Sequence, residues 1–228
     1  MQVSHSRVET FENCKYKYKL QYVNKLKTLQ NDDPSNPLFL GTALHTGIEK
    51  DAEIAIKEYY QNYPIITDLH INEAIKLKSI IKKAKEMLPE NGIHELKIEN
   101  EHFIGFIDLL VPIDNSENEF DLYDFKYSNN IDHYLKSRQL HEYKYFFELT
   151  NPDKKIRDLY FLFVPKIQIK QKKSEDLYQF RTRLENELDL KEPKLVKIDY
   201  DPNKVIDFAM KTKELREENE FSKNPNKL

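Results

Sequence analysis

The chain has 228 residues, enough to enclose a hydrophobic core, and 39% of them are hydrophobic while 33% are charged, which excludes an intrinsically disordered protein. No apolar run reaches the roughly 18 residues that a membrane span needs, and the N-terminus lacks an apolar signal region, so we expect a cytoplasmic protein with no membrane partner. Because the formal net charge is −3, any binding of nucleic acid would depend on local basic patches.

Residues 1–92 have the periodicity of a mainly helical section. Apolar residues recur at helical spacing, and we expect helices over residues 7–23, about 40–60 and about 71–88. The segment 31–37 consists of Asn, Asp, Ser and Pro residues and predicts a loop between the first two helices.

Residues 93–228 carry the pattern of strands mixed with helices. Strands are expected over 93–100, 101–112, 120–127, 158–165 and 195–200, with a turn at 114–118. Helices are expected over 134–149 and from Pro202 onward. The segment 158–165 is almost continuously apolar, which is typical of a strand buried on both faces. This order predicts a single α/β domain in which helices flank a central mixed β-sheet, with the N-terminal helical section beside it.

Asp124-Phe125-Lys126 lies on the third predicted strand. Because side chains alternate between the two faces of a strand, Asp124 and Lys126 share one face and Phe125 points into the core. A surface ion pair is the commonest reason for an Asp and a Lys two residues apart, so this pattern alone does not indicate a site.

Asp108 supplies a second acid inside the otherwise apolar strand segment 105–111. The turn at 114–118 would return the chain so that Asp108 and Asp124 converge beside the ammonium of Lys126. Two neighbouring carboxylates repel each other unless a cation neutralises them, and oxygen ligands suit Mg²⁺ or Mn²⁺. Such an ion could activate water and offset charge on a phosphate, while Lys126 orients the water or stabilises the developing charge. These residues indicate a metal-dependent nuclease.

Three further residues extend this constellation. His45 lies on the second predicted helix between Gly41 and Gly47, which would allow close approach of another backbone. Gln139 and Tyr143 are four residues apart and share a helix face. Each has an ordinary alternative: His45 as a satisfied structural residue, and the other two as packing beside a surface amide.

Basic residues gather in two places. Residues 1–30 carry six Lys or Arg against two Glu, and a second run consists of Lys166, Lys170, Lys172 and Lys173. Placed near phosphates, such residues would supply non-specific affinity for nucleic acid. The alternative is that these lysines simply form a solvated surface.

Together these motifs resemble the RecB-like branch of the PD-(D/E)XK nuclease superfamily over about residues 4–143. Two N-terminal segments, Ser4-x-Ser6-Arg7 and Thr10-Phe11-x-x-Cys14-x-x-x-Tyr18, look like that branch's first motif, although Lys15 stands where a proline is usual. The remaining matches, in order, are Gly41-x-x-x-His45, Gly105-Phe106-Ile107-Asp108, Asp124-Phe125-Lys126 and Gln139-x-x-x-Tyr143.

The resemblance implies a restriction-endonuclease-like α/β catalytic core in residues 93–228, with the histidine motif on the helical section 1–92. It implies that two Mg²⁺ or Mn²⁺ ions are bound by His45, Asp108, Asp124 and the backbone carbonyl of Phe125. Lys126 would be the catalytic lysine, and Gln139 and Tyr143 would position that lysine or the DNA strand. Contacts with DNA are implied for Arg7, Lys15 and Tyr18.

Cys14 is the single cysteine of the chain, which excludes an internal disulfide and suits a reducing compartment. Many relatives of this branch combine a cysteine at this position with three near the C-terminus to hold a [4Fe–4S] cluster. One thiolate cannot hold such a cluster, so we expect none. Cys14 is then either a buried apolar residue or part of a chain truncated before the other three.

The sequence thus predicts a metal-dependent DNA exonuclease that acts on single-stranded or end-bearing DNA in recombination, repair or phage DNA processing. DNA is the expected partner, and recombination or CRISPR-adaptation proteins are further candidates. One alternative is a nuclease fold that binds DNA or a partner without cleaving, and another is a nuclease component of a larger complex. No pattern predicts the oligomeric state.

Overall fold

The computed structural model describes residues 1–224 except residues 30, 115 and 117, and within them five strands form one sheet in the order β1-β2-β3-β4-β5. The strands are β1 (Ile93–Glu99), β2 (Ile104–Pro112), β3 (Glu119–Tyr127), β4 (Lys155–Val164) and β5 (Lys194–Ile198). Neighbouring strands are antiparallel except β3 and β4, which are parallel. A parallel pair needs a crossover, and α6 (Ile131–Leu135) and α7 (Gln139–Thr150) provide it. The predicted α/β fold with a mixed sheet is confirmed.

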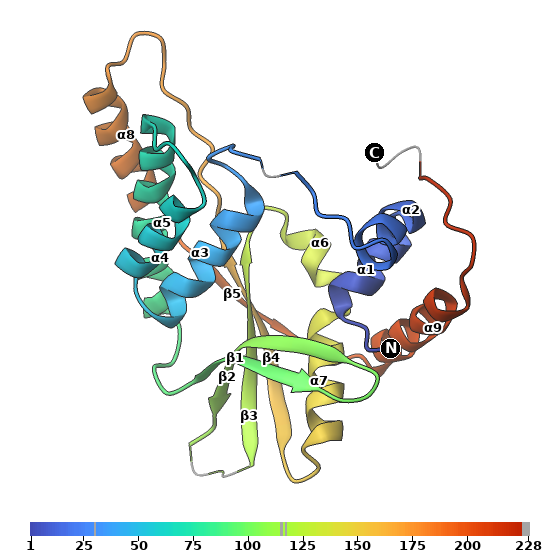
Figure 1. Ribbon diagram of the computed structural model, residues 1–228. Coiled ribbons are helices and arrows are strands. Elements are labelled where there is room, and N and C mark those ends of the chain that lie inside the picture. The colour runs from blue at the N-terminus through green and yellow to red at the C-terminus, as the bar shows by residue number, and fades with distance from the viewer. Residues whose placement is uncertain (30, 115, 117, 225–228) are drawn as a thin grey trace.

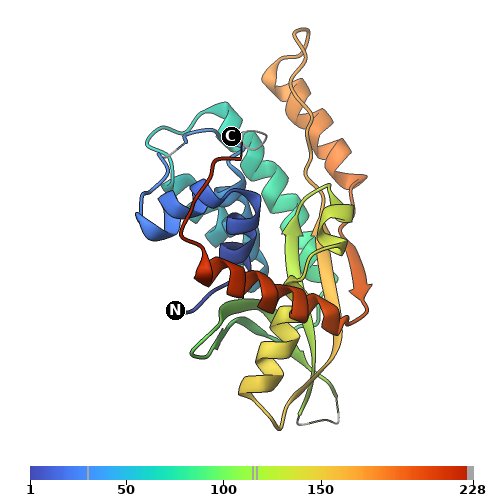
Figure 2. The same ribbon diagram turned by 90° about the vertical axis from the view of Figure 1, so that its right-hand side faces the viewer.

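Helices cover both faces of this sheet (Figures 1 and 2). On one face lie α3 (Pro37–Glu49), α4 (Ala52–Gln61) and α5 (Asp68–Glu86), whose apolar side chains share a core with Phe125 of β3. On the other lie α1 (His5–Asn13), α7 and α9 (Pro202–Glu217), which share a core with Phe161 of β4. Among the described residues, no helix is both long and apolar enough to cross a bilayer.

The helix expected over residues 7–23 is divided in the structure. It consists of α1, α2 (Lys15–Tyr18) and the π-helical turn η1 (Lys19–Val23). The division falls at Cys14, whose backbone is extended with φ −162° and ψ 105°. Its Sγ accepts a hydrogen bond of 3.4 Å from the Lys17 N–H. Cys14 therefore both ends α1 and caps α2, a role usually taken by Ser or Asp.

The helices expected over 40–60 and 134–149 are also each divided into two. Asp51 separates α3 from α4, because its carboxylate accepts a 2.8 Å hydrogen bond from the Ile54 N–H and starts a new helix. Residues 136–138 separate α6 from α7. Helical periodicity alone did not reveal these breaks, because the apolar spacing continues across them.

The helix α8 (Leu177–Asp189) was missed, since no helix or strand was expected between the predicted strands at 158–165 and 195–200. Asp176 and Gln179 form a capping box at its start. Phe180, Leu184 and Leu188, spaced by four residues, give it a buried face. Both signals were present in the sequence. Residues 115 and 117 of the predicted 114–118 turn lie outside the described residues.

Candidate metal centre

Three acidic residues lie in a row across strands β1, β2 and β3. The antiparallel register of β1 and β2 places Glu95 across from Asp108. The register of β2 and β3, continued by one residue, places Asp124 across from Asp108 on its other side. Sheet pairing therefore brings together three carboxylates that are far apart in the sequence.

Asp108 holds β2 and β3 together where the ladder of paired residues stops. The paired positions of these strands run from Pro112 to Leu109, and Asp108 is the next residue. Its Oδ2 accepts a 2.6 Å hydrogen bond from the Phe125 N–H. This contact places the backbone of Phe125 at the carboxylate row, while metal ligation by the Phe125 carbonyl stays a prediction.

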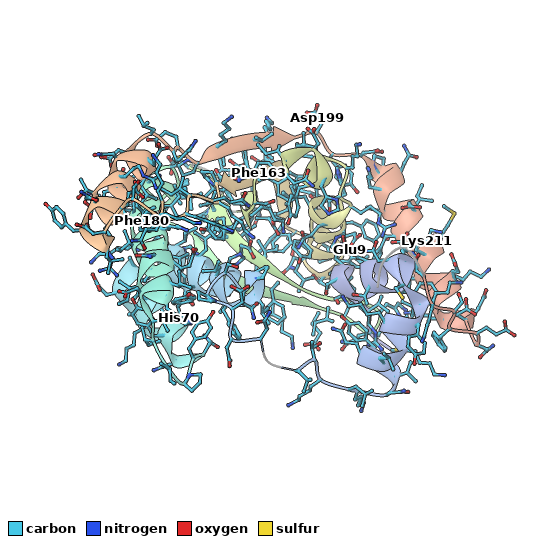
Figure 3. All side chains as sticks on the ribbon, turned by 90° about the horizontal axis from the view of Figure 1, so that it is seen from above. Glu9, His70, Phe163, Phe180, Asp199 and Lys211 are labelled. Carbon is cyan, nitrogen blue, oxygen red and sulfur yellow. The ribbon has the colours of Figure 1, made fainter. Side chains whose placement is uncertain are left out.

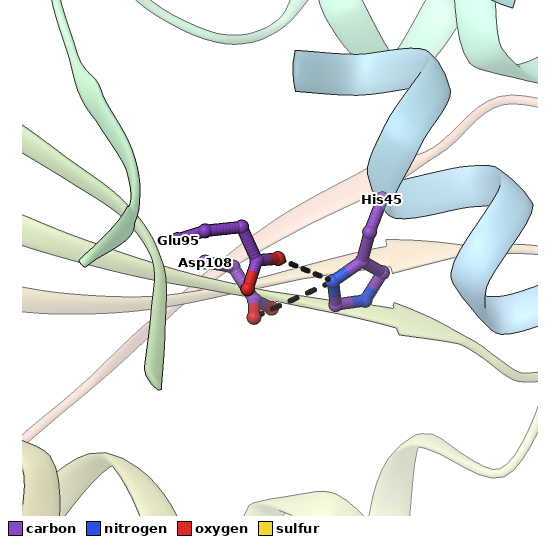
Figure 4. A group of neighbouring side chains, drawn as sticks. All are labelled: His45, Glu95 and Asp108. Atoms are coloured by element: carbon purple, nitrogen blue, oxygen red, sulfur yellow. Dashed lines mark ion pairs between the residues drawn. The ribbon is translucent and has the colours of Figure 1, made fainter. Parts of the chain in front are cut away.

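Glu95 is the member of the site that the sequence interpretation missed. Its φ of +50° lies in the left-handed region, which is unusual for a residue other than glycine and often accompanies a functional site. Ligand atoms of Glu95, Asp108 and His45 all lie within 4.8 Å of one another (Figure 4). Counting the register outward from the short connection at residues 100–103 would have placed Glu95 opposite Asp108.

His45 reaches this row from α3 on the other side of the site. Its Nδ1 lies 3.4 Å from Asp108 Oδ1 and 3.5 Å from Glu95 Oε1.

The expectation that Gly41 and Gly47 allow close approach of another backbone was wrong in detail. A Cβ at Gly47 would lie 2.4 Å from the Ile81 side chain, so this glycine admits a side chain of α5, whereas a Cβ at Gly41 would have nothing within 4 Å among the described residues.

Lys126 lies beside Asp124 and continues the site toward α7. Its Nζ is 2.5 Å from Asp124 Oδ2 and donates a 2.8 Å hydrogen bond to Gln139 Oε1. Gln139 Nε2 in turn donates a 3.0 Å hydrogen bond to Tyr143 Oη. Tyr143 packs so closely over Gly105 that a Cβ there would lie 2.8 Å from its ring. The structure thus joins the predicted lysine, glutamine and tyrosine in one hydrogen-bonded chain.

The site holds more negative charge than its burial tolerates. Burial and the neighbouring Asp124 raise the pKa of Asp108 to about 7, although His45 and Lys126 oppose the rise. Burial disfavours the charged form of His45, but the charges of Asp108, Glu95 and Asp124 prevail and raise its pKa to about 9. Asp124 and Asp108 likewise raise the pKa of Lys126 against the effect of its burial. Protons compensate the carboxylates here, and a bound cation could replace them.

The donor set fits a divalent cation. Asp124 is 1% exposed, and its Oδ2 lies 2.5 Å from the Lys126 ammonium, with which it forms an ion pair. A buried carboxylate oxygen of this kind is costly unless a positive partner approaches it. Carboxylate oxygens from Glu95 and Asp108, with one imidazole nitrogen from His45, suit Mg²⁺ or Mn²⁺, and Asp124 lies next to this group, across from Asp108.

The structure does not bring the three predicted DNA contacts to this site. Arg7 donates to the Gln2 carbonyl at 3.2 Å and lies over the Tyr22 ring. Lys15 forms ion pairs with two glutamates at the end of the chain's last helical segment, Glu214 and Glu218. Tyr18 is 3% exposed and packs among Phe11, Tyr22 and Phe221. In this conformation Lys15 and Tyr18 join the N-terminal helices to the C-terminal segment, whereas these contacts of Arg7 lie within residues 1–22.

Cys14 lies in the same N-terminal region and is buried. Hydrogen bonds from the backbone of Asn224 and Lys17 lower the pKa of its thiol despite its burial. The Tyr16 N–H also donates to the Ser222 carbonyl at 3.1 Å. Cys14 therefore packs where the N-terminal helices meet the C-terminal segment 222–224, and the absence of a cluster there stays a prediction.

Comparisons with known proteins agree with this architecture. The family model for the PD-(D/E)XK nuclease superfamily matches residues 2–226. A solved structure described as a candidate exonuclease from Eubacterium rectale is similar with a TM-score of 0.54 and 11% identity, covering 94% of this chain and 79% of that chain. At this identity the likeness shows the fold alone. No curated protein matches the sequence.

Proposed function

Because this chain belongs to the PD-(D/E)XK nuclease superfamily, whose members are phosphodiester hydrolases, we propose that it is a DNA exonuclease that requires Mg²⁺ or Mn²⁺. The observation that carries the proposal is the convergence of His45, Glu95 and Asp108, with Asp124 across from Asp108 and paired with the ammonium of Lys126. We further propose that the substrate is single-stranded or end-bearing DNA in recombination, repair or phage DNA processing.

Each residue of the site has a proposed task. His45, Asp108 and Asp124, with the Phe125 carbonyl, would hold up to two ions, and Glu95 is added here as a further ligand. A bound divalent cation would activate water and offset charge on the phosphate. Lys126 is held by Gln139 and keeps its proton, so it would stabilise the developing negative charge on the phosphate oxygens.

Gln139 and Tyr143 act as positioning residues in this proposal. Gln139 fixes the Lys126 ammonium through its Oε1, and Tyr143 fixes the Gln139 amide. Burial raises the pKa of Tyr143, so its phenol stays neutral and accepts the amide N–H. The chain of hydrogen bonds therefore holds the lysine beside Asp124.

The direct test is degradation of end-labelled linear DNA by the purified protein. We expect hydrolysis with Mg²⁺ or Mn²⁺, none in EDTA, and resistance of closed circular single-stranded DNA, since an exonuclease needs an end. Cleavage of the circle would show that the protein is an endonuclease and not an exonuclease. If the wild type and Asp124→Ala were equally inactive on every DNA and with both metals, a non-cleaving role would take the place of this proposal.

The Glu95→Gln variant tests the residue that the register adds to the site. We expect Mn²⁺ affinity, measured by calorimetry, to fall by about 10- to 100-fold, the range found when groups that support a bound metal are removed. Glu99→Gln is the matched control, because Glu99 lies on the same strand and its side chain is equally exposed, 44% in both cases. Equal Mn²⁺ affinity in the two variants would remove Glu95 from the ligand set.

A further inference from the structure

A cavity of about 850 Å³ opens at the C-terminal ends of β3 and β4, and we call it the β3–β4 cavity. Tyr127 at the end of β3 lines it, together with residues of α5, the loops 33–35 and 166–171, and Phe180 of α8. Seen from above, Phe180 lies on the side of α5 and α8, across the molecule from Lys211 of α9 (Figure 3). Ligands of α/β sheets commonly bind outside the carboxyl ends of the parallel strands, and β3 and β4 are the parallel pair.

The β3–β4 cavity and the candidate metal centre share two elements of the fold. Tyr127 follows Lys126 directly and lies three residues after Asp124, which is roughly 10 Å along a strand. On α3, Leu40 lines the cavity five residues before His45, roughly 7.5 Å along the helix axis. A polynucleotide bound across the metal centre would thus reach the cavity within a few nucleotides.

The cavity offers positive charge that the protein does not neutralise. Among the lining residues, Lys76 is paired with Glu73 at 2.6 Å, while Asp33, whose carboxylate accepts hydrogen bonds from Ser35, keeps its negative charge. By contrast, Lys166 and Lys170 form no ion pair with any residue that the structure describes. Three lysines against the carboxylates of Asp33 and Glu73 leave the lining with one excess positive charge, in a chain of net charge −3, and this local excess favours phosphate.

Tyr127 gives the cavity an aromatic surface next to these lysines. Its side chain is half-buried, and the Lys166 Nζ lies 5.3 Å from the ring centroid. In proteins that bind single strands, aromatic rings stack with bases and nearby cations contact the backbone phosphates. Stacking tolerates any sequence because every base has a π-face. In a duplex those faces are covered by neighbouring base pairs, so this surface favours an unpaired base.

The walls of the cavity are fixed before any ligand binds. Asn129 and Lys166 exchange two hydrogen bonds between side chain and backbone, at 2.9 and 2.8 Å, which join the segments that follow β3 and β4. Tyr59 donates a 2.7 Å hydrogen bond to the Pro34 carbonyl, and Arg181 of α8 donates to Asn72 of α5 at 3.1 Å. Such a preformed surface loses little entropy when it binds a strand.

We propose that the β3–β4 cavity binds the unpaired DNA strand beside the scissile phosphate, with Tyr127 stacking on a base and Lys166 and Lys170 contacting phosphates. This inference rests on the proposed nuclease function and names the form of its substrate. The cavity makes the enzyme selective for a DNA segment that is single-stranded on this side of the cleavage site.

The test measures binding of a fluorescent oligothymidylate in EDTA, so that no hydrolysis is needed. We expect Tyr127→Leu to weaken binding by about fivefold or more, as for loss of a stacked base. Lys166→Ala should weaken binding and lower the slope of log affinity against log salt by about 0.7, the value for one phosphate contact.

The matched controls are Tyr178→Leu, an exposed tyrosine of α8, and Lys82→Ala, an exposed lysine of α5, neither of which lines the cavity. Both should bind as the wild type, and thermal melting should show all four variants folded.

The outcomes separate this inference from the proposed function. Binding that Tyr127→Leu and Lys166→Ala leave unchanged, in a protein that hydrolyses DNA, would overturn the cavity assignment and leave the nuclease intact. Binding that both variants weaken, in a protein that never hydrolyses DNA, would support the cavity and overturn the nuclease. Tighter binding of oligouridylate than of oligothymidylate would overturn the choice of unpaired DNA. So would an equal loss of affinity in the two variants for a fully paired DNA hairpin.

Discussion

The Asp108→Asn variant is expected to lose about a thousandfold in hydrolysis rate, because a bound metal supplies several kcal/mol of transition-state stabilisation and each 1.4 kcal/mol or so is tenfold in rate. Asparagine keeps the shape of the side chain, and its oxygen can still accept from the Phe125 N–H. It removes one negative charge from the row that would hold the cation. The measurement is the initial rate on end-labelled linear DNA at saturating Mn²⁺.

The same substitution should stabilise the metal-free protein. The folded-state pKa of Asp108, about 7, lies above its ordinary value of 3.8, so the folded chain binds the proton more tightly than the unfolded chain does. Stability therefore falls as pH rises through this window. The gain in melting temperature from Asp108→Asn, measured in EDTA, should be largest above pH 7 and should disappear toward pH 4.

Addition of Mn²⁺ should reverse the order of the melting temperatures, so that the wild type melts above Asp108→Asn. The wild type gains stability by binding the ion in its folded state, whereas Asp108→Asn should gain little. A variant that keeps wild-type activity, or that melts lower than the wild type in EDTA at pH 8, would contradict the assignment of Asp108 to a carboxylate row that needs a cation.

Lys126→Met is the second change for which we expect a large effect, a loss of about 100- to 1,000-fold in rate, the usual cost of removing one group that stabilises developing charge. Methionine retains much of the apolar stem but carries no ammonium. Because the metal-binding carboxylates stay in place, Mn²⁺ affinity should be kept or increased. This contrast with Asp108→Asn separates charge stabilisation from metal binding.

Removal of the ammonium also leaves Asp124 without its ion-pair partner. The two side chains are 14% and 1% exposed, and breaking a buried pair from one side commonly costs about 3–5 kcal/mol. Lys144→Met is the matched control, because Lys144 is 15% exposed and pairs with Glu148 at 2.7 Å away from the site. The control should lose stability but not activity, and a Lys126→Met rate within tenfold of the wild type would argue against the proposed task of Lys126.

The sequence alone was sufficient for the five strands and the α/β fold, and it singled out most of the residues that lie together at the candidate site. A buried strand shows as an apolar run, so Asp108 stood out within residues 105–111, and alternation placed Asp124 and Lys126 on one face. The breaks at Cys14 and Asp51 were not predicted, because capping contacts interrupt a helix without changing its apolar spacing. The helix α8 was missed although its capping residues were visible.

What the sequence by itself determined was the family resemblance and the local chemistry: two acids on strands, a lysine beside one of them, a histidine on a helix, and a glutamine and a tyrosine one turn apart. Only the tertiary structure decided how they combine. Pairing of β1 with β2 brings Glu95 opposite Asp108, and the packing of α3 sets His45 above both. Lys15 and Tyr18 were predicted to contact DNA, but in the structure Lys15 forms ion pairs within the protein and Tyr18 is buried. The physical reason is that spacing along a chain fixes which face a side chain shares, whereas strand register and helix packing fix which distant side chains meet.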